Sequence, residues 1–330
     1  MKRTLLVAAI STLAAGAAMA QSTVTIYGRL NTSAERQKYI TDTTGESTSV
    51  LANNGSRLGF KGEEDLGGGL KAGFTLEHRF NSDNGAATNA AFWGGAGESS
   101  VNLSGGFGMV KAGHYTSEAY FATSDVTDLL NHGTGTSSDQ LYKYLGTDNN
   151  KVSYRTPALG PVTAELGYIF GESTVAAPAN HSYDLAINYA AGPIGVGLGA
   201  EKVASGPTAG GGDSQVGVRV SYSASPITVT GYVQRYKKDA ADASKTIARV
   251  SAQYDIGAIE LHVALGMATK LTDNVPAAPV LDEQKARQYT LGVNYNLSKR
   301  TKVYTYYDKV AVSNTSVDPS AFAVGIRHNF

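Results

Sequence analysis

The sequence has no cysteine in its 330 residues, so it can form neither a disulfide framework nor a thiolate metal site. It also has no surplus of basic residues, because 28 Lys and Arg are matched by 28 Asp and Glu. A nucleic-acid-binding protein is therefore not expected. Beyond residue 20 there is no apolar run of about 18 residues, and so a membrane-spanning helix is not expected either.

The first twenty residues have the pattern of a secretory signal peptide. The basic pair Lys2-Arg3 precedes an apolar run from Thr4 to Ala15, and Ala18-Met19-Ala20 supplies an A-x-A cleavage site. We expect residues 1–20 to direct export through the general secretory pathway and to be removed after Ala20. Residues 21–330 are then expected to form a single domain, either a secreted β protein or an outer-membrane barrel.

Glycine and tyrosine are abundant, with 38 and 19 copies, and they accompany short alternating strands. In residues 55–77, GSRLGFKGEEDLGGGLKAGFTLE, two alternating runs flank a turn that holds three glycines. Successive strand residues point to opposite faces, so one face of this hairpin is apolar and the other is charged. The unit recurs along the chain. About seven tight turns, each joining two strands, plus a lone first and last strand predict about sixteen strands.

The connections differ at the two ends of these strands. Tight turns lie at one end, whereas long polar connections such as 37–54, 81–97 and 270–285 lie at the other. This asymmetry is typical of outer-membrane barrels, whose short turns face the periplasm. Alternation alone does not decide between a barrel and a soluble sandwich, because both have one apolar face.

Three further features favour lipid outside and water inside. Aromatic pairs such as Tyr183 with Tyr189 and Tyr289 with Tyr295 lie near the ends of the apolar face, as in interfacial girdles. The other face is rich in charge, and each Arg or Lys turned toward lipid near the midplane would cost about 2–4 kcal/mol. Phe330 ends an alternating strand whose edge can pair with the first strand and close the barrel. Closure is required in lipid, because unpaired backbone N–H and C=O groups are costly there. We predict an all-β fold, a transmembrane antiparallel β-barrel of about 16 strands.

Short motifs spread over nearly the whole mature chain carry a family resemblance. They are VTIYGRLN at 24–31, EEDLGGGLKAGF at 63–74, VNLSGGFGMVKAG at 101–113, NLSKRT at 296–301 and GIRHNF at 325–330. With the signal peptide, they resemble the general porins of the Gram-negative outer membrane, in particular the β-proteobacterial branch. The resemblance implies a homotrimer in contact with outer-membrane lipid and lipopolysaccharide. It also implies passive diffusion of ions and small hydrophilic solutes.

The resemblance further implies a long third loop that folds into the barrel and narrows it. Here that loop is the irregular stretch from Glu118 to Asn150. The residues expected at the constriction are Arg57, which matches the family's wall arginine, and Arg29, Lys61, Arg79, Lys111 and Arg155, which follow from alternation; the loop acids are Glu118, Asp125, Asp128 and Asp139. Phe330 is expected to act as a C-terminal assembly signal. Opposed charges of this kind create a transverse field that tunes ion preference.

One departure from the family pattern bears on selectivity. Some relatives carry arginines just before the strand at Ser99 and again just before Asn149, and they are strongly anion-selective. In this sequence those places read Gly94–Glu98 and Gly146–Asp148, with acids and without arginine. A weakly selective or cation-leaning pore is therefore at least as well favoured as an anion-selective one.

The sequence gives little indication of catalysis or cofactor binding. The six histidines have no metal-ligand spacing, no nucleophile elbow is present, and the run Gly195-x-Gly197-x-Gly199 lies in a strand rather than opening a helix. We expect no enzyme and no cofactor. Two alternatives to a general porin stay open: a substrate-specific porin for a sugar or organic acid, and a surface adhesin or anchoring barrel. The substrate-specific porin would need an aromatic track, and Tyr27, Tyr115 and Tyr232 are too scattered to form one.

Overall fold

The computed structural model describes residues 23–38, 46–88, 92–93, 97–132, 140–172, 181–203, 212–239, 242–269, 284–313 and 318–330. The expected signal peptide lies outside these residues. Among them, no helix has the length and apolar character needed to cross a membrane.

Strands make up most of the described chain, which also contains the short helix α2 (Glu118–Ala122) and the 3-10 turn η1 (Asp125–Thr127). The strands are β1 Thr23–Lys38, β2 Thr48–Asn53, β3 Arg57–Gly67, β4 Leu70–Arg79, β5 Glu98–Gly105, β6 Gly108–His114, β7 Lys151–Arg155, β8 Val162–Ile169, β9 Ser182–Ala191, β10 Ile194–Val203, β11 Ser214–Ala224, β12 Ile227–Lys238, β13 Ala243–Ile256, β14 Ile259–Ala268, β15 Ala286–Asn296, β16 Thr301–Val312 and β17 Ser320–Asn329.

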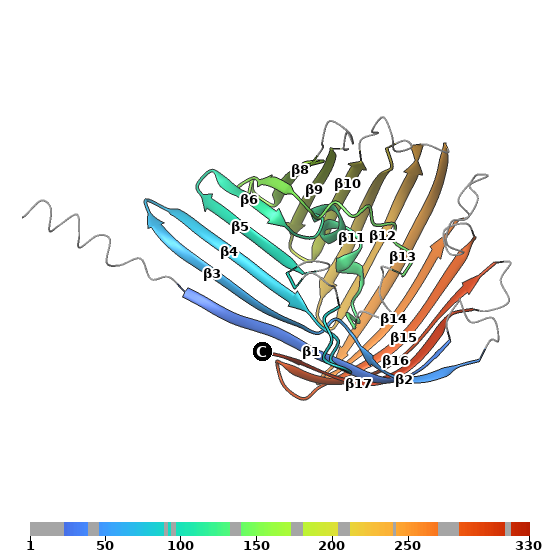
Figure 1. Cartoon of the computed structure of the whole chain (residues 1–330). Helices are drawn as coiled ribbons and strands as arrows, with labels where there is room; N and C mark the ends of the chain where they lie inside the picture. Colours follow the sequence, from blue (N-terminus) through green and yellow to red (C-terminus); the bar gives the residue numbers. More distant parts are fainter. Residues whose placement is uncertain are drawn as a thin grey trace, which may run out of the picture.

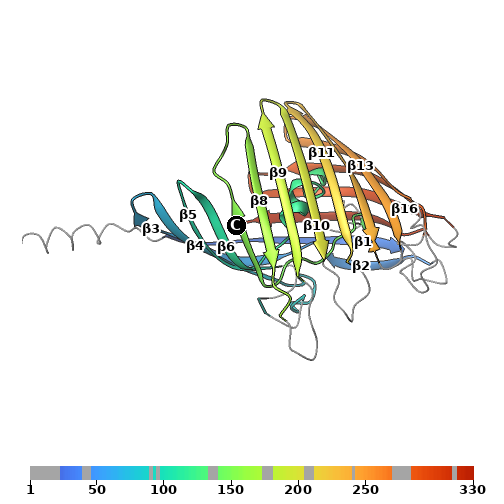
Figure 2. The ribbon, with the colours of Figure 1, turned by 90° about the horizontal axis from the view of Figure 1, so that it is seen from above.

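The strands form a closed antiparallel barrel (Figures 1 and 2). From β3 onward each strand pairs with the next along the chain, and β1 also pairs with β17 over ten residues. Both β2 and β3 pair with β1, on either side of the break at residues 54–56, so together they make one interrupted strand. The barrel therefore has sixteen strands, and the predicted fold is confirmed.

Turn chemistry explains the short connections. Between β3 and β4, Gly67, Gly68 and Gly69 have φ values of +83°, +62° and +81°. Residues other than glycine rarely adopt this left-handed backbone conformation, which explains why three successive glycines occur in this turn. The seven predicted tight turns are all present at one end of the barrel, and the long connections join the strands at the other end.

The burial pattern is inverted relative to a soluble protein. On β14, Leu261, Val263, Leu265 and Met267 are 40–54% exposed, whereas the alternate residues, such as His262, face inward and are buried. Polar side chains fill the interior instead: Asn31, Gln234 and Asn294 are fully buried and hydrogen-bonded. The apolar outer face therefore matches lipid, and the polar inner face matches water.

Aromatic side chains mark the two edges of the apolar band. Tyr183 and Tyr189 on β9 are exposed, as are Tyr289 and Tyr295 on β15. Each pair is six residues apart, which corresponds to about 20 Å along a strand. Exposed aromatic pairs near the ends of the apolar face are typical of the interfacial girdles of outer-membrane barrels.

The last residue closes the seam of the barrel. Phe330 and Gly28 exchange two backbone hydrogen bonds, with N···O distances of 3.0 and 3.1 Å. A methyl group at position 28 would overlap the Phe330 ring, so the ring lies directly over the glycine. The aromatic C-terminus thus packs at the junction of the first and last strands; its role as an assembly signal stays a prediction.

Candidate functional site

Helix α2 lies against the inner face of β9 and β10 (Figure 2). Its small residues Ala119 and Ala122 are buried against this wall. A methyl group at Gly197 would overlap the carbonyl oxygen of Ala122, and one at Gly199 would overlap that of Ala119. The glycine run on β10 therefore allows close approach of the helix backbone.

The wall also holds the start of α2 by hydrogen bonds. The carboxylate of Asp184 on β9 accepts from the backbone N–H groups of Glu118 and Ala119, at 2.8 and 3.0 Å, and from the Ser117 hydroxyl at 3.2 Å. These N–H groups have no partner within the helix, and a negative charge at this end is favourable. Lys151 on β7, fully buried, forms an ion pair with the same carboxylate at 2.9 Å.

Two later points of the loop are attached to other strands. Gln234 on β12 exchanges hydrogen bonds with the backbone N–H and carbonyl of Lys143, at 3.0 and 2.9 Å. His132 binds Asn294 on β15 at 2.8 Å and stacks on Tyr304 with ring centroids 3.6 Å apart. Burial lowers the pKa of His132 to about 3, so its ring stays neutral at physiological pH.

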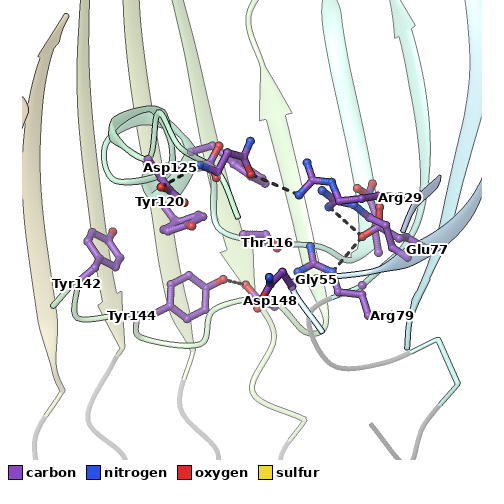
Figure 3. Close-up of a pocket in the computed structure, with 17 residues that line it drawn as sticks. Arg29, Gly55, Glu77, Arg79, Thr116, Tyr120, Asp125, Tyr142, Tyr144 and Asp148 are labelled. Atoms are coloured by element: carbon purple, nitrogen blue, oxygen red, sulfur yellow. Dashed lines mark hydrogen bonds and ion pairs between the residues drawn. The ribbon is translucent and has the colours of Figure 1, made fainter. Parts of the chain in front are cut away.

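A cavity of about 650 Å³ separates the loop from the wall formed by β1, β3 and β4 (Figure 3). The wall presents Arg29, Arg57 and Arg79 side by side, because Arg29 is in register with Arg57 and Arg57 with Arg79. Like charges directly opposite on neighbouring strands are destabilising. Glu77 offsets part of this repulsion, with a carboxylate oxygen 3.5 Å from Arg57 Nη1 and 3.2 Å from Arg79 Nε.

The loop side of the cavity carries carboxylates and aromatic rings. Asp125, Asp128 and Asp148 line it, as do Tyr120, Phe121, Tyr142 and Tyr144. Figure 3 shows the labelled tyrosines across the cavity from Arg29 and Arg79. The site is thus a cavity between a wall that carries three arginines and a loop that carries carboxylates and aromatic rings.

Comparison with known proteins decides the family. The family model described as Gram-negative porin matches residues 4–315 of the chain.

The chain belongs to the Gram-negative porin family.

Individual relatives agree with this assignment. The porin is 34% identical to outer membrane porin protein 32 of Delftia acidovorans over 326 residues, which cover 92% of this chain and 88% of the relative. It is 28% identical to an outer membrane porin protein of Bordetella pertussis over the whole of both chains. Both relatives come from the β-proteobacterial branch that the sequence resembled.

Solved structures share the fold. An anion-selective porin from Comamonas acidovorans superposes with a TM-score of 0.71 at 27% identity, covering 94% of this chain and all of that one. OmpT of Vibrio cholerae gives a TM-score of 0.69 at 16% identity, which shows the barrel fold alone. The chain is therefore an outer-membrane porin, a water-filled channel for passive diffusion of ions and small hydrophilic solutes, and its family is not one of enzymes.

The structure brings together half of the residues predicted for the constriction of this porin. Arg29, Arg57, Arg79, Asp125 and Asp128 all line the cavity. Asp139 lies outside the described residues.

The other predicted residues do not line the cavity, and each has its own partner. Lys61 lies over the Tyr27 ring, with Nζ 5.4 Å from the centroid. Lys111 forms an ion pair with Glu98 at 2.8 Å. Arg155 binds Glu118 at 3.1 Å and Glu165 at 2.6 Å.

Glu118 has a perturbed acidity within this ion-pair cluster. Burial, reinforced by the neighbouring Glu165 carboxylate, raises the pKa of Glu118 to about 7, although Arg155 and Lys111 oppose the shift. Its charge therefore changes in the physiological range. Burial also raises the pKa of Asp148, whose carboxylate accepts a hydrogen bond from the Tyr144 hydroxyl.

Sequence reasoning missed the aromatic side of the cavity. It considered only inward-facing strand residues as an aromatic track, whereas the cavity takes its rings from the loop. The signal was present, because Tyr120-Phe121 and Tyr142-Lys143-Tyr144 stand out in an otherwise polar segment. Glu98 and Asp148, noted earlier for replacing arginines, also line the cavity.

Proposed function

We propose that the cavity is the narrowest part of the channel and that it conducts ions without a strong preference for anions. The observation that carries this proposal is the charge of its lining. The bases are Arg29, Arg57 and Arg79, and the acids are Glu77, Glu98, Asp125, Asp128 and Asp148. Two of the five acids, Glu98 and Asp148, stand where some relatives carry arginine.

The opposed charges act across a passage whose walls are low-dielectric protein. Such walls focus the field, so the basic and acidic sides orient dipolar solutes as they pass. The excess of acids over bases then offsets the attraction of anions to the arginines. The solved relative from Comamonas acidovorans is anion-selective, and we infer that this porin departs from it.

The test is the reversal potential of the porin in a planar bilayer under a potassium chloride gradient. We expect a value near zero or on the potassium side. A reversal potential close to the chloride equilibrium potential would overturn the selectivity proposal.

We also propose that the native form is a homotrimer. OmpT of Vibrio cholerae, which shares the fold, has been solved in a trimer form. The expected form is a detergent-resistant trimer on unheated gels, with conductance steps in groups of three. A stable monomer in mild detergent, with single steps of conductance, would contradict this assembly.

Lipopolysaccharide is the lipid partner we propose, because basic side chains gather on the outer face at the long-loop end. Those with exposed side chains include Arg36, Lys202, Arg235, Lys237 and Arg287. Lys202 and Lys237 flank Ser214 in register across three neighbouring strands. Although Asp239 lies 3.4 Å from Lys237, the row is well placed for lipid phosphates at the headgroup level.

This partner can be tested by thermal unfolding in vesicles with and without lipopolysaccharide. We expect lipopolysaccharide to raise the unfolding temperature of the porin and K202Q K237Q to lose most of that gain. The control is K71Q, which removes an exposed lysine at the tight-turn end of β4, where it forms an ion pair with Glu63. An equal gain in all three proteins would exclude the basic row.

Finally, we propose that residues 1–20 are a signal peptide removed after Ala20. The basic pair, apolar run and A-x-A site support it. Mass spectrometry of the porin from purified outer membranes should show Gln21 as the first residue. Retention of residue 1 in folded, membrane-inserted protein would disprove the cleavage.

A further inference from the structure

The aromatic side of the cavity forms one cluster around Tyr120. Its ring centroid lies 5.7 Å from that of Phe121, 5.5 Å from that of Tyr142 and 5.7 Å from that of Tyr144. Two of these contacts are edge-on, with interplanar angles of 67° and 85°. Edge-to-face contacts are a preferred packing of aromatic rings, so the cluster is a preorganised surface.

Phe121 is the member of this cluster that faces water most fully. Its side chain is 42% exposed, although Ala119 and Ala122 on the same helix are buried against the barrel wall. An apolar ring exposed in a polar passage is unfavourable in water. It gains contact area when a second ring lies on it.

A separated pair of charges lies in the same cavity. Arg29 donates to the neutral side-chain amide oxygen of Asn131 at 3.4 Å and forms no ion pair within the described part of the chain. The backbone N–H of Asn131 donates in turn to the Asp128 carboxylate at 3.2 Å. One asparagine thus bridges a guanidinium and a carboxylate, with Asp125 also on the lining.

We propose that the cavity binds, during passage, solutes that combine a zwitterionic head with an aromatic ring, such as aromatic amino acids. The solute carboxylate binds Arg29, its ammonium group faces Asp128 and Asp125, and its ring stacks on Phe121. A zwitterion suits the site because the cavity offers both signs of charge and no net attraction for an anion. This inference rests on the proposal that the cavity lies in the conducting path.

The test measures block of the potassium chloride current by glycine, leucine and phenylalanine in planar bilayers holding the full porin. All three are zwitterions, and leucine supplies an apolar side chain without a ring. We expect phenylalanine to halve the current at a concentration roughly two- to tenfold below that of leucine, as an aromatic contact would provide. Equal potency of phenylalanine and leucine would overturn the aromatic part.

Probes with a single charge test the zwitterionic part. Phenylacetate lacks the ammonium group and phenethylamine lacks the carboxylate. Each should block less well than phenylalanine. If either equals phenylalanine, the corresponding charge contact is absent and the zwitterion proposal fails.

Matched variants test the residues. F121L keeps an apolar side chain of similar size but removes the ring, and it should abolish the difference between phenylalanine and leucine. R29Q should weaken block by phenylalanine and phenylacetate. The controls are V126S, an exposed apolar residue of the same loop, and K61Q, an inward-facing lysine, neither of which lines the cavity. Unchanged discrimination in F121L would refute the role of this ring.

The two proposals fail in different ways. If salt current and glycine permeation are normal but phenylalanine shows no advantage, the aromatic inference is wrong and the porin assignment stands. If E98Q D148N leaves ion selectivity unchanged, the cavity does not limit conduction, and the placement of the constriction fails first.

Discussion

Individual residues set how closely the loop approaches the wall of this porin. Gly197 and Gly199 bring the α2 backbone against β10, and the aromatic residues of α2 then face the cavity. A single methyl group at this contact would change the width of the passage. Glu118 instead affects the charge of the lumen, because its carboxyl group changes its ionisation with pH.

We expect G197A to lower single-channel conductance. The added methyl group would overlap the Ala122 carbonyl oxygen, so α2 must move away from β10 and into the lumen. The control is G195A on the same strand, where the nearest atom is the Ser221 hydroxyl oxygen at 2.6 Å, at the end of a side chain that can rotate. Wild-type conductance in G197A would show that α2 does not limit the passage.

The ion preference should shift toward anions as the pH falls from 8.5 to 5.5. The pKa of Glu118 is raised to about 7, so its carboxyl is ionised above this value and neutral below it. Protonation removes one negative charge beside Arg155, which makes this part of the lumen more positive. Reversal potentials over this pH range should show a step near pH 7 in the wild type but not in E118Q. The same step in E118Q would assign the titration to another group.

At the scale of elements, the loop is held by the strands rather than by its own helix. A helix of five residues is far too short to be stable alone, since isolated helices below about 12 residues are marginal in water. The Asp184 carboxylate supplies partners for its first turn, and Lys151 neutralises that carboxylate. Wall and loop are therefore expected to fold as one unit.

We expect D184N to destabilise the barrel by about 3–5 kcal/mol, because it leaves the Lys151 ammonium buried without its partner. The double variant K151M D184N should destabilise the barrel less than D184N, because no buried charge is left without a partner. The free energies of unfolding of both variants can be measured by urea unfolding in lipid vesicles, followed by far-ultraviolet circular dichroism. The control E63Q breaks an exposed ion pair with Lys71 and should have little effect, because water screens such pairs. A double variant as unstable as D184N would contradict the buried-charge argument.

At the scale of the whole molecule, selectivity follows from the summed charge of residues far apart in the chain. We expect E98Q D148N to shift the reversal potential toward chloride, because it reduces the five acids of the lining to three against three arginines. The control is E64Q, which removes an exposed carboxylate on the outer face of β3. If both variants shift the reversal potential equally, the shift comes from the overall surface charge of the porin and not from the charges that line the cavity.

Much of the barrel could be predicted from local patterns. Alternation with a period of two assigns each side chain to a face, and glycine turns mark where strands reverse, so the strand count and the inverted burial were both accessible. The basic side of the site was partly accessible for the same reason, since Arg29, Arg57 and Arg79 share the inward phase. Lys61 and Lys111 share it too, yet they lie elsewhere.

Local sequence patterns are enough to predict the barrel, its apolar outer face and its charged lining, because these features depend mainly on residues a few positions apart. Which charges meet at the cavity depends on the three-dimensional arrangement of the strands and the loop. Alternation assigns a face but neither a height along the barrel nor a position around it, and both depend on strand register. The course of the loop depends on contacts such as Ser117 with Asp184 and Lys143 with Gln234, between residues 67 and 91 positions apart. No local pattern encodes them.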